Sequence, residues 1–256
     1  MMRPAAFAAV IAAAAACAPV ANAAPVEVHP AGSSVPENLL RIELRFDRPL
    51  RGFFDVGQLR LVDAEGLPIE HAFLDLALPS ADGRRVAVLL NPGRVKSGVG
   101  PNRALGRALH AGGQVRLVLD DPATGFGPVV KTWTITAFQS QGPQPRLWSL
   151  TPPTVHTRQA LVVRLRAPIS ASSQEMIAVR DAAGRRVVGR TGLSGGDTVW
   201  TFVPAVPWQP GGHALVTHPD LEDPAGNRTC AAFEQPRASD ARCDAGVTLP
   251  FSPARA

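Results

Sequence analysis

The feature that most constrains the fold is a pattern of alternating runs and turn residues that occurs twice, in the same order. The matched blocks of the first and second copies are 40–49 with 161–168, 59–69 with 177–187, 84–90 with 197–202, 111–117 with 210–216, and 121–125 with 223–226. Two of these pairs also share their turn residues, Asp-Ala-x-Gly in one and Asp-Pro-Ala in the other. Five matched blocks in one order indicate two copies of one module.

Within each copy the blocks predict β-strands. Leu40–Phe46 and Val115–Leu119 alternate apolar and polar residues, which indicates half-buried strands, and Val86–Leu90 is an apolar run typical of a central strand. No segment before residue 138 shows sustained helical periodicity, and only Arg103–His110 is expected to form a short helical turn. About seven short strands in about 100 residues favour an Ig-like β-sandwich. We therefore predict an all-β protein with two tandem Ig-like sandwiches.

The chain begins with the features of a secretory signal peptide, predicted for residues 1–23. A positive start precedes an Ala-rich apolar run over 5–20, and Ala21-Asn22-Ala23 has the small-x-small form of a cleavage site. The run is too short and Ala-rich for a membrane span, which needs ~20 strongly apolar residues. We expect a mature chain that is periplasmic, secreted or at the cell surface. An N-terminal membrane anchor and lipidation at Cys17 are the alternatives.

The repeat also predicts where the modules begin and end. The first sandwich is expected over 24–137 and the second over 147–234. Residues 138–146 between them are polar and rich in Gly and Pro, as is typical of a linker. Residues 235–256 then form a C-terminal tail.

The cysteines predict one disulfide bond. Cleavage after Ala23 removes Cys17 and leaves Cys230 and Cys243, an even pair in an oxidising compartment. Closing a loop of this size contributes about 3 kcal/mol. We expect the bridge to tie the tail back to the second sandwich.

The basic charge narrows the classes of partner. The net charge is +5 and the pI is near 10.0, almost entirely from arginine, because Lys96 and Lys131 are the only lysines. A basic protein often binds nucleic acid, but an exported one rarely meets it. The expected partners are an envelope component, an anionic glycan or lipid headgroup, or another protein, and not nucleic acid. Arginine enrichment from GC-rich coding explains the same charge without a ligand.

A basic segment over 91–113 is the first candidate site, because the second copy lacks a segment of comparable length. It carries Arg94, Lys96, Arg103 and Arg107, and no acidic residue. Guanidinium and backbone N–H groups suit phosphate or carboxylate, so these four residues are candidates for binding an anion. The alternative is a solvated loop that covers one end of the sandwich.

A second candidate lies just after the last matched strand. Asp220, Glu222, Asp223 and Asn227 supply oxygen ligands of the kind that Ca²⁺ prefers, although their spacing is not that of an EF-hand loop. The alternative is that Asp223-Pro224-Ala225-Gly226 simply forms a turn.

No catalytic pattern stands out. The six histidines show no HxH or HxxxH spacing, and no G-x-S-x-G elbow is present. We therefore expect neither an enzyme nor a cofactor. Trp133 and Trp200 lie within strand patterns and are expected in the cores, whereas Trp148 and Trp208 adjoin Pro-rich joints and are expected to pack between the modules.

The stretches VPENLLRIELRFDRPL, LVDAEGLPI and DPATG, with VRDAAGRRV and LEDPAGN in the second copy, resemble bacterial Ig-like modules of the S-layer-protein type. More narrowly, LLNPGRVKSGVGPNRALGRAL and WTFVPAVPWQPGGHALV are similar to exported bacterial proteins built from two such modules. The resemblance implies the sandwich fold over nearly the whole mature chain. It implies almost no specific function, because this fold hosts many unrelated roles.

A more distant resemblance is to the periplasmic copper-binding sandwich of copper-resistance systems, which also has an early strand ending in an F-x-x-P turn. That family usually builds its copper site from an N-terminal histidine. Here the expected mature terminus is Ala24 and the nearest histidine is His29. The main expectation is therefore an exported, non-enzymatic binding or structural module of the envelope or surface. The alternative is a periplasmic carrier of copper, calcium or a small ligand.

Overall fold

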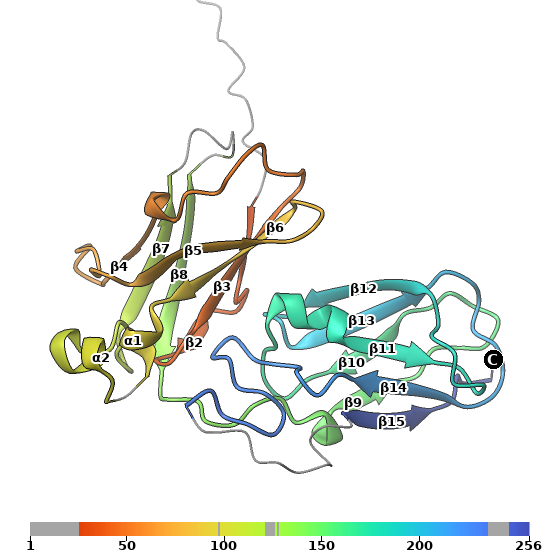
Figure 1. The fold of residues 1–256 in the computed structure, drawn as a ribbon. Coiled ribbons are helices and arrows are strands. Elements are labelled where there is room, and N and C mark those ends of the chain that lie inside the picture. The colour runs from red at the N-terminus through yellow and green to blue at the C-terminus, as the bar shows by residue number, and fades with distance from the viewer. Residues whose placement is uncertain (1–25, 97, 121–125, 127, 235–245, 256) are drawn as a thin grey trace, which may run out of the picture.

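The computed structural model describes residues 26–96, 98–120, 126, 128–234 and 246–255, and almost all regular structure in this part of the chain is β-strand (Figure 1). Its strands form four sheets, two in each half of the chain. The prediction of an all-β fold with Ig-like sandwiches is confirmed. The expected signal peptide and Cys17 lie outside the described residues.

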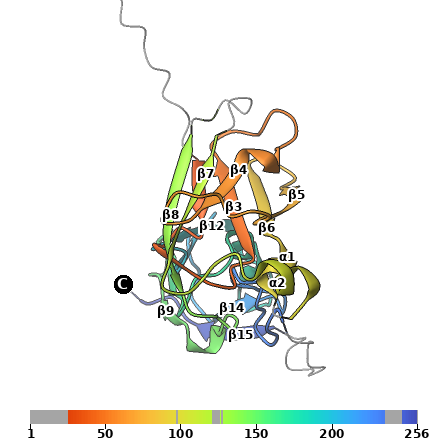
Figure 2. The same ribbon diagram turned by 90° about the vertical axis from the view of Figure 1, so that its left-hand side faces the viewer.

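The first module contains β1 to β8. One sheet has the order β1 (Val26–His29), β3 (Arg41–Phe46), β6 (Arg85–Leu90), β5 (Phe73–Pro79). The other has the order β2 (Ser34–Pro36), β8 (Val129–Thr136), β7 (Gln114–Leu119), β4 (Leu59–Val62). Figure 2 shows β8 and β5 on opposite sides of this module.

The described part of the first module also contains short helices. A 3₁₀ turn, η1 (Val56–Gln58), precedes β4, and α1 (Pro92–Val95) and α2 (Gly100–Leu105) follow β6. The helical turn expected at 103–110 therefore begins and ends earlier. It ends because Gly106, with φ of 71°, takes the left-handed conformation that stops a helix.

The second module contains β9 to β15. One sheet has the order β12 (Gly189–Ser194), β13 (Val199–Pro204), β10 (Leu161–Arg164), β9 (Ser149–Thr151). The other has the order β11 (Ile177–Arg180), β14 (His213–Thr217), β15 (Val247–Phe251). The 3₁₀ turns η3 (Pro145–Leu147) and η4 (Ala171–Met176) precede β9 and β11.

Strand β15 differs from the expected C-terminal tail. Residues 235–256 were expected to lie outside the sandwich, but β15 pairs with the whole of β14, from His213–Phe251 to Thr217–Val247. It is buried at Val247 and Phe251, so its alternation supplies core side chains. The second sandwich therefore includes Val247–Phe251.

The repeat holds at the level of single hydrogen bonds. In the first module Asp63 N–H donates to Leu67, and Leu67 N–H donates back to the Asp63 carboxylate. Asp181 and Arg185 make the same two bonds in the second module. The shared Asp-Ala-x-Gly turn thus has one physical basis in both copies: an Asp side chain that satisfies the turn's own backbone.

Each module has its own core. Trp133 and Trp200 are fully buried in the first and second cores, as expected from their strand patterns. The expectation for the other two tryptophans is wrong. Trp148 and Trp208 pack in the second core with Phe202 and Phe251, not between the modules, because the Pro-rich segments fold back over the end of their own sandwich.

Candidate functional site

Charged side chains of the two modules meet in buried ion pairs at the junction between them. The junction starts on the outer face of the β1–β3–β6–β5 sheet. Ile42 and Leu44 point into the first core, so the alternating residues Arg41 and Glu43 point outward. Cross-strand pairing places His29 of β1 beside Glu43. The second module packs against this outer face.

Asp197 of the second module forms the most buried contact of the junction. Its side chain is about 1% exposed, and one carboxylate oxygen lies 2.8 Å from His29 Nδ1. The other oxygen accepts a 2.7 Å hydrogen bond from the Ala31 backbone N–H. Both oxygens therefore bind the first module.

The backbone of Asp197 adopts a conformation that is unfavourable for most residues other than glycine. In the second module the Leu165 N–H donates a hydrogen bond to the Thr198 carbonyl, and in the first module the Phe46 N–H donates an equivalent one to the Arg84 carbonyl. The residues just before these two acceptors, Asp197 and Gly83, are therefore at equivalent positions. Gly83 has a φ of 65° and Asp197 a φ of 67°. This region is unfavourable for residues with a Cβ. The second module holds a carboxylate there, and that carboxylate binds His29.

The charges around His29 alter its acidity. Burial of the ring acts to lower the pKa of His29, but the hydrogen bond and charge of Asp197, with smaller contributions from Glu43 and Glu27, raise the pKa above its usual 6.5. The protonated imidazole is thus favoured when the modules are docked.

A second ion pair lies beside the first. Arg41 pairs with Glu222 of the second module, and both side chains are largely buried. Ser172 of η4 links Arg41 to Glu43, since its hydroxyl accepts from Arg41 at 3.3 Å and donates to Glu43 at 3.1 Å. At the rim, Arg85 bonds to the more exposed Glu175 at 2.8 Å. In each of these ion pairs the first module therefore supplies the cationic side chain and the second module the carboxylate.

Main-chain bonds reinforce these ion pairs. The N–H groups of Leu40 and Arg41 both donate to the Pro224 carbonyl, at 3.0 and 2.9 Å. Pro224 sits in a turn that Asp223 stabilises, because the buried Asp223 carboxylate accepts from the N–H groups of Ala225 and Asn227. Burial raises the pKa of Asp223 to about 6, against the hydrogen bonds from Asn227 and Ala225, which act to lower it.

The predicted linker is hydrogen-bonded to both modules. The Gln139 carbonyl accepts from the side-chain amides of Asn38 in the first module and Asn227 in the second, at 2.8 and 2.9 Å. Gly142 lies so close to the Arg228 carbonyl that a Cβ at this position would collide with it. The joint is therefore a packed part of the junction.

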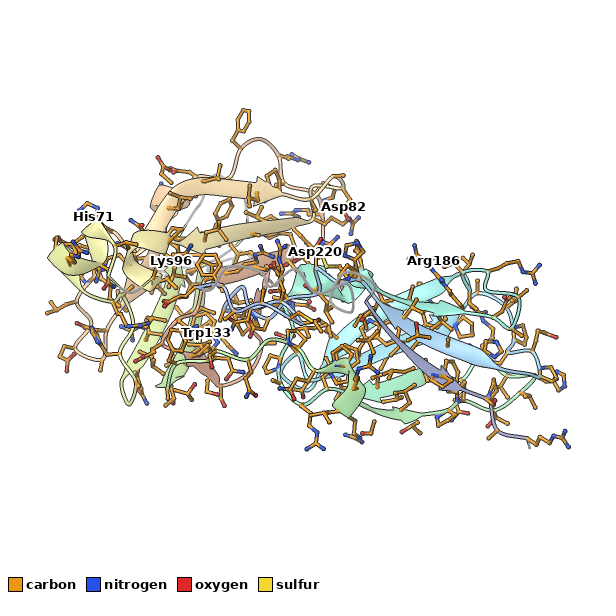
Figure 3. The ribbon with its side chains drawn as sticks, turned by 60° about the horizontal axis from the view of Figure 1, so that its bottom comes forward. His71, Asp82, Lys96, Trp133, Arg186 and Asp220 are labelled. Atoms are coloured by element: carbon orange, nitrogen blue, oxygen red, sulfur yellow. The ribbon has the colours of Figure 1, made fainter. Side chains whose placement is uncertain are left out.

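The predicted calcium ligands do not converge. Asp220 pairs with Arg228, Glu222 with Arg41, and only Asp223 and Asn227 contact each other, with Asn227 also bonding Gln139 and Phe233. Within the described ranges, no group of three His, Cys, Asp or Glu side chains could hold a metal ion. Glu222, Asp223 and Asn227 instead contribute to the junction, near which Figure 3 shows Asp220.

The predicted anion-binding residues do not converge either. Arg94 is buried, and its guanidinium donates to the carbonyls of Glu70, Gly106 and Arg107. Arg94 therefore links the two short helices to the segment that contains Glu70. An anion site needs N–H donors that reach solvent, and the guanidinium of Arg94 is buried. Arg103 lies exposed on α2.

The other two cations of this segment stack on aromatic rings of the junction. Lys96 Nζ lies 4.4 Å from the ring centre of Phe233, and the Arg107 guanidinium lies 5.1 Å from that of Phe138. Phe233 lies near the end of the described segment 128–234, in the second half of the chain, yet it packs against the core of the first module. The basic segment therefore contributes to the junction, a role that its composition did not indicate.

The predicted disulfide stays a prediction. Cys230 lies in the turn that follows Asn227 and Arg228, and Cys243 lies outside the described residues.

One apolar groove was not expected from the sequence. It measures about 590 Å³ and lies at the end of the second module, between the β11 hairpin and the segment after β13, with Val188, Val206 and Trp208 in its walls. Figure 3 labels Arg186, which also lines it, on the second module, away from Trp133 of the first. The repeated prolines at 204, 207 and 210 are the one sequence signal for it.

Comparisons with known proteins agree with the fold and go no further. No protein-family model matches the sequence, and no curated protein matches it significantly. Among solved structures, it is similar to the S-layer protein rSbsC at 8% identity, covering 90% of this chain and 40% of that one, with a TM-score of 0.30. It is also similar to the titin Ig tandem domains at 10% identity, covering 84% and 87%, with a TM-score of 0.26.

A third similar structure is the N-terminal Ig1-2 module of the Drosophila receptor protein tyrosine phosphatase DLAR, at 12% identity, covering 76% of this chain and 91% of that one, with a TM-score of 0.23. No helix among the described residues is long and apolar enough to cross a membrane. Its own sheets make the chain a tandem of Ig-like β-sandwich domains.

Proposed function

We propose that this chain is an exported, non-enzymatic scaffold of the cell envelope or surface, in which two Ig-like modules are fastened into one rigid unit that presents its outer surfaces to other molecules. The observation that carries the proposal is the junction. Two buried ion pairs, His29–Asp197 and Arg41–Glu222, hold the modules together with a pair of main-chain bonds to Pro224.

The junction supports a scaffold better than a carrier that closes around a ligand. The space lined by His29, Glu43 and Gln174 measures about 10 Å³, the least that one water molecule requires. A carrier that binds between two domains needs a cavity of about 300 Å³ or more that both domains line. The space of about 310 Å³ beside the linker is lined by residues of the linker and the second module alone, such as Gln139, Gly142 and Asp223. Here the facing surfaces are used for bonds between the modules.

Cooperative unfolding tests this proposal. Because the junction is buried and charged, differential scanning calorimetry should show one transition for the two modules. Arg41→Ala leaves Glu222 buried without its partner, so it should split the transition in two. Arg185→Ala is the matched control: it removes a surface pair with Asp181, away from the junction, and should leave one transition.

Two independent transitions in the unaltered chain would refute the rigid unit. Export is checked separately, because the product secreted by a bacterial host should begin at Ala24 by N-terminal sequencing. Retention of residues 1–23 on a cytoplasmic product would refute that part of the proposal and leave the calorimetric result intact.

A further inference from the structure

The free edge of the first module carries an exposed aromatic side chain beside an apolar groove. Strand β5 ends its sheet, and among the described strands only β6 pairs with it; Figure 2 shows it at the outside of the module. The segment 50–56 runs alongside, and the groove between them measures about 310 Å³. Phe53 belongs to this groove and is fully exposed.

The strand that forms one wall of this groove carries exposed leucines, of which Leu76 lines the groove itself. Leu74, Leu76 and Leu78 of β5 are 36%, 46% and 41% exposed. Single exposed leucines are ordinary, but contiguous apolar surface on a soluble protein marks a site of interaction. Phe53 and Leu76, which both line the groove and are exposed, form such a surface, and burying one aromatic side chain removes ~150–250 Å² from water.

The charges at the groove are balanced. Asp75 lies in its wall, and Arg51 lies between the wall residues Leu50 and Gly52. Both are exposed, and neither has a charged or hydrogen-bonding partner among the residues that the structure describes. The neighbouring Asp55 and Asp82 bond within their own turns, to Gln58 and to Ser80 and Arg84. One cation and one anion therefore remain to bind a partner.

We infer that this edge is a self-association surface whose partner is a second copy of the chain, related by a two-fold axis. A two-fold contact requires a surface that complements itself. This one offers a projecting ring and a groove, a free cation and a free anion. In such a dimer Phe53 of each copy enters the groove of the other, and Arg51 pairs with the other copy's Asp75.

The balance of charge favours this occupant over an anionic lipid or glycan. Those ligands require an excess of cations, and Arg51 and Asp75 cancel each other. The surface also lies wholly on the first module. Self-association therefore does not depend on how the two modules are fastened, and its failure would leave the proposed scaffold intact.

Sedimentation equilibrium of the chain purified after export to the periplasm tests the inference. The unaltered chain should show a concentration-dependent monomer–dimer equilibrium. Phe53→Ser, Arg51→Asp and Asp75→Arg should each weaken the dimer at least about tenfold, and the Arg51→Asp/Asp75→Arg double variant should regain most of it. Leu67→Ser is the control, since Leu67 is 63% exposed on a different hairpin and should change nothing.

Circular dichroism and the melting temperature show whether each variant folds, and all altered side chains are exposed. A monomer at every concentration up to about 0.5 mM, or a double variant as weak as the single ones, would overturn the inference. Association that Leu67→Ser weakens as much as Phe53→Ser would also overturn it, because it would show unspecific adhesion of exposed apolar groups.

Discussion

The Asp197 carboxylate should control both the strength of the junction and its dependence on pH. In Asp197→Asn the side chain keeps its size and tolerates the same backbone conformation, but it can no longer accept from both His29 and Ala31 or attract a protonated imidazole. Breaking one partner of a buried pair costs about 3–5 kcal/mol. We expect the lower end, about 3 kcal/mol, because His29 can lose its proton rather than remain buried with an unpaired charge.

The pH dependence has a defined sign. Because the folded state raises the pKa of His29 above 6.5, its contribution to stability is complete below that value and is lost as pH rises through the folded pKa. Asp223 acts in the same direction at lower pH: its pKa rises from 3.8 to about 6, so stability falls as pH rises between them. The free energy of unfolding of the unaltered chain should therefore be larger at pH 6 than at pH 8.5.

Urea unfolding at these two pH values measures both effects, with tryptophan fluorescence as the signal. Trp133 reports on the junction, because its indole donates to the Pro30 carbonyl next to His29. The cost of Asp197→Asn should be largest at pH 6 and smaller at pH 8.5. Asp181→Asn is the control: its carboxylate accepts backbone N–H bonds from Ala183 and Arg185 in an exposed turn with no histidine, so its cost should not change with pH in this range.

The outcome that contradicts this reasoning is a cost for Asp197→Asn below about 1 kcal/mol, or an equal cost at both pH values. Either result would mean that the His29–Asp197 contact does not carry the junction. His29→Gln should then be tested with Asp197→Asn in a double-mutant cycle, which isolates the energy of this one pair.

Three further predictions follow from other parts of the structure. Arg94→Met should lower the free energy of unfolding by about 3 kcal/mol in urea unfolding, because buried carbonyls lose their donor, whereas Arg103→Met should change it by less than about 0.5 kcal/mol. Gly142→Ala should cost about 2 kcal/mol or more in the same assay through its collision with Arg228, whereas Gly212→Ala, which meets no neighbouring atom, should be nearly neutral. Intact mass of the exported protein before and after reduction and alkylation should show one disulfide, and two free thiols would contradict it.

Much of the fold is readable from the sequence because local signals and global packing agree. Alternation at 40–46 and 115–119 predicts the strands that the structure contains, and the Asp-Ala-x-Gly turn predicts a hairpin in both copies. Strand β15 was missed because a segment as short as Val247–Phe251, next to the chain end and containing Pro250, has little periodic signal of its own. Its place comes from pairing with β14, which is a tertiary effect.

The junction was much harder to predict than the fold. His29 and Asp197 lie 168 residues apart, and no spacing rule relates residues at that distance. The clusters that composition did highlight, the basic segment and the acidic turn, were read as sites for external ions. In the structure much of their charge is used within the protein: Arg94 binds carbonyls, and Glu222 binds Arg41. Composition shows that charged residues are present, but only the fold shows whether a charged side chain has a partner within the protein.

The repeat allows the requirements of the fold to be separated from those of the junction. Apart from β2, which has no counterpart among the described strands of the second copy, both copies form corresponding strands and the same turn, so what one copy lacks is not needed to build a sandwich. Asp197 stands where the first copy has Gly83, the basic segment 91–113 occurs only in the first copy, and Phe233 reaches from the second half of the chain into the first core. These unshared features meet at the junction. The joined pair of modules, rather than either module alone, is therefore the unit to which the proposed scaffold function applies.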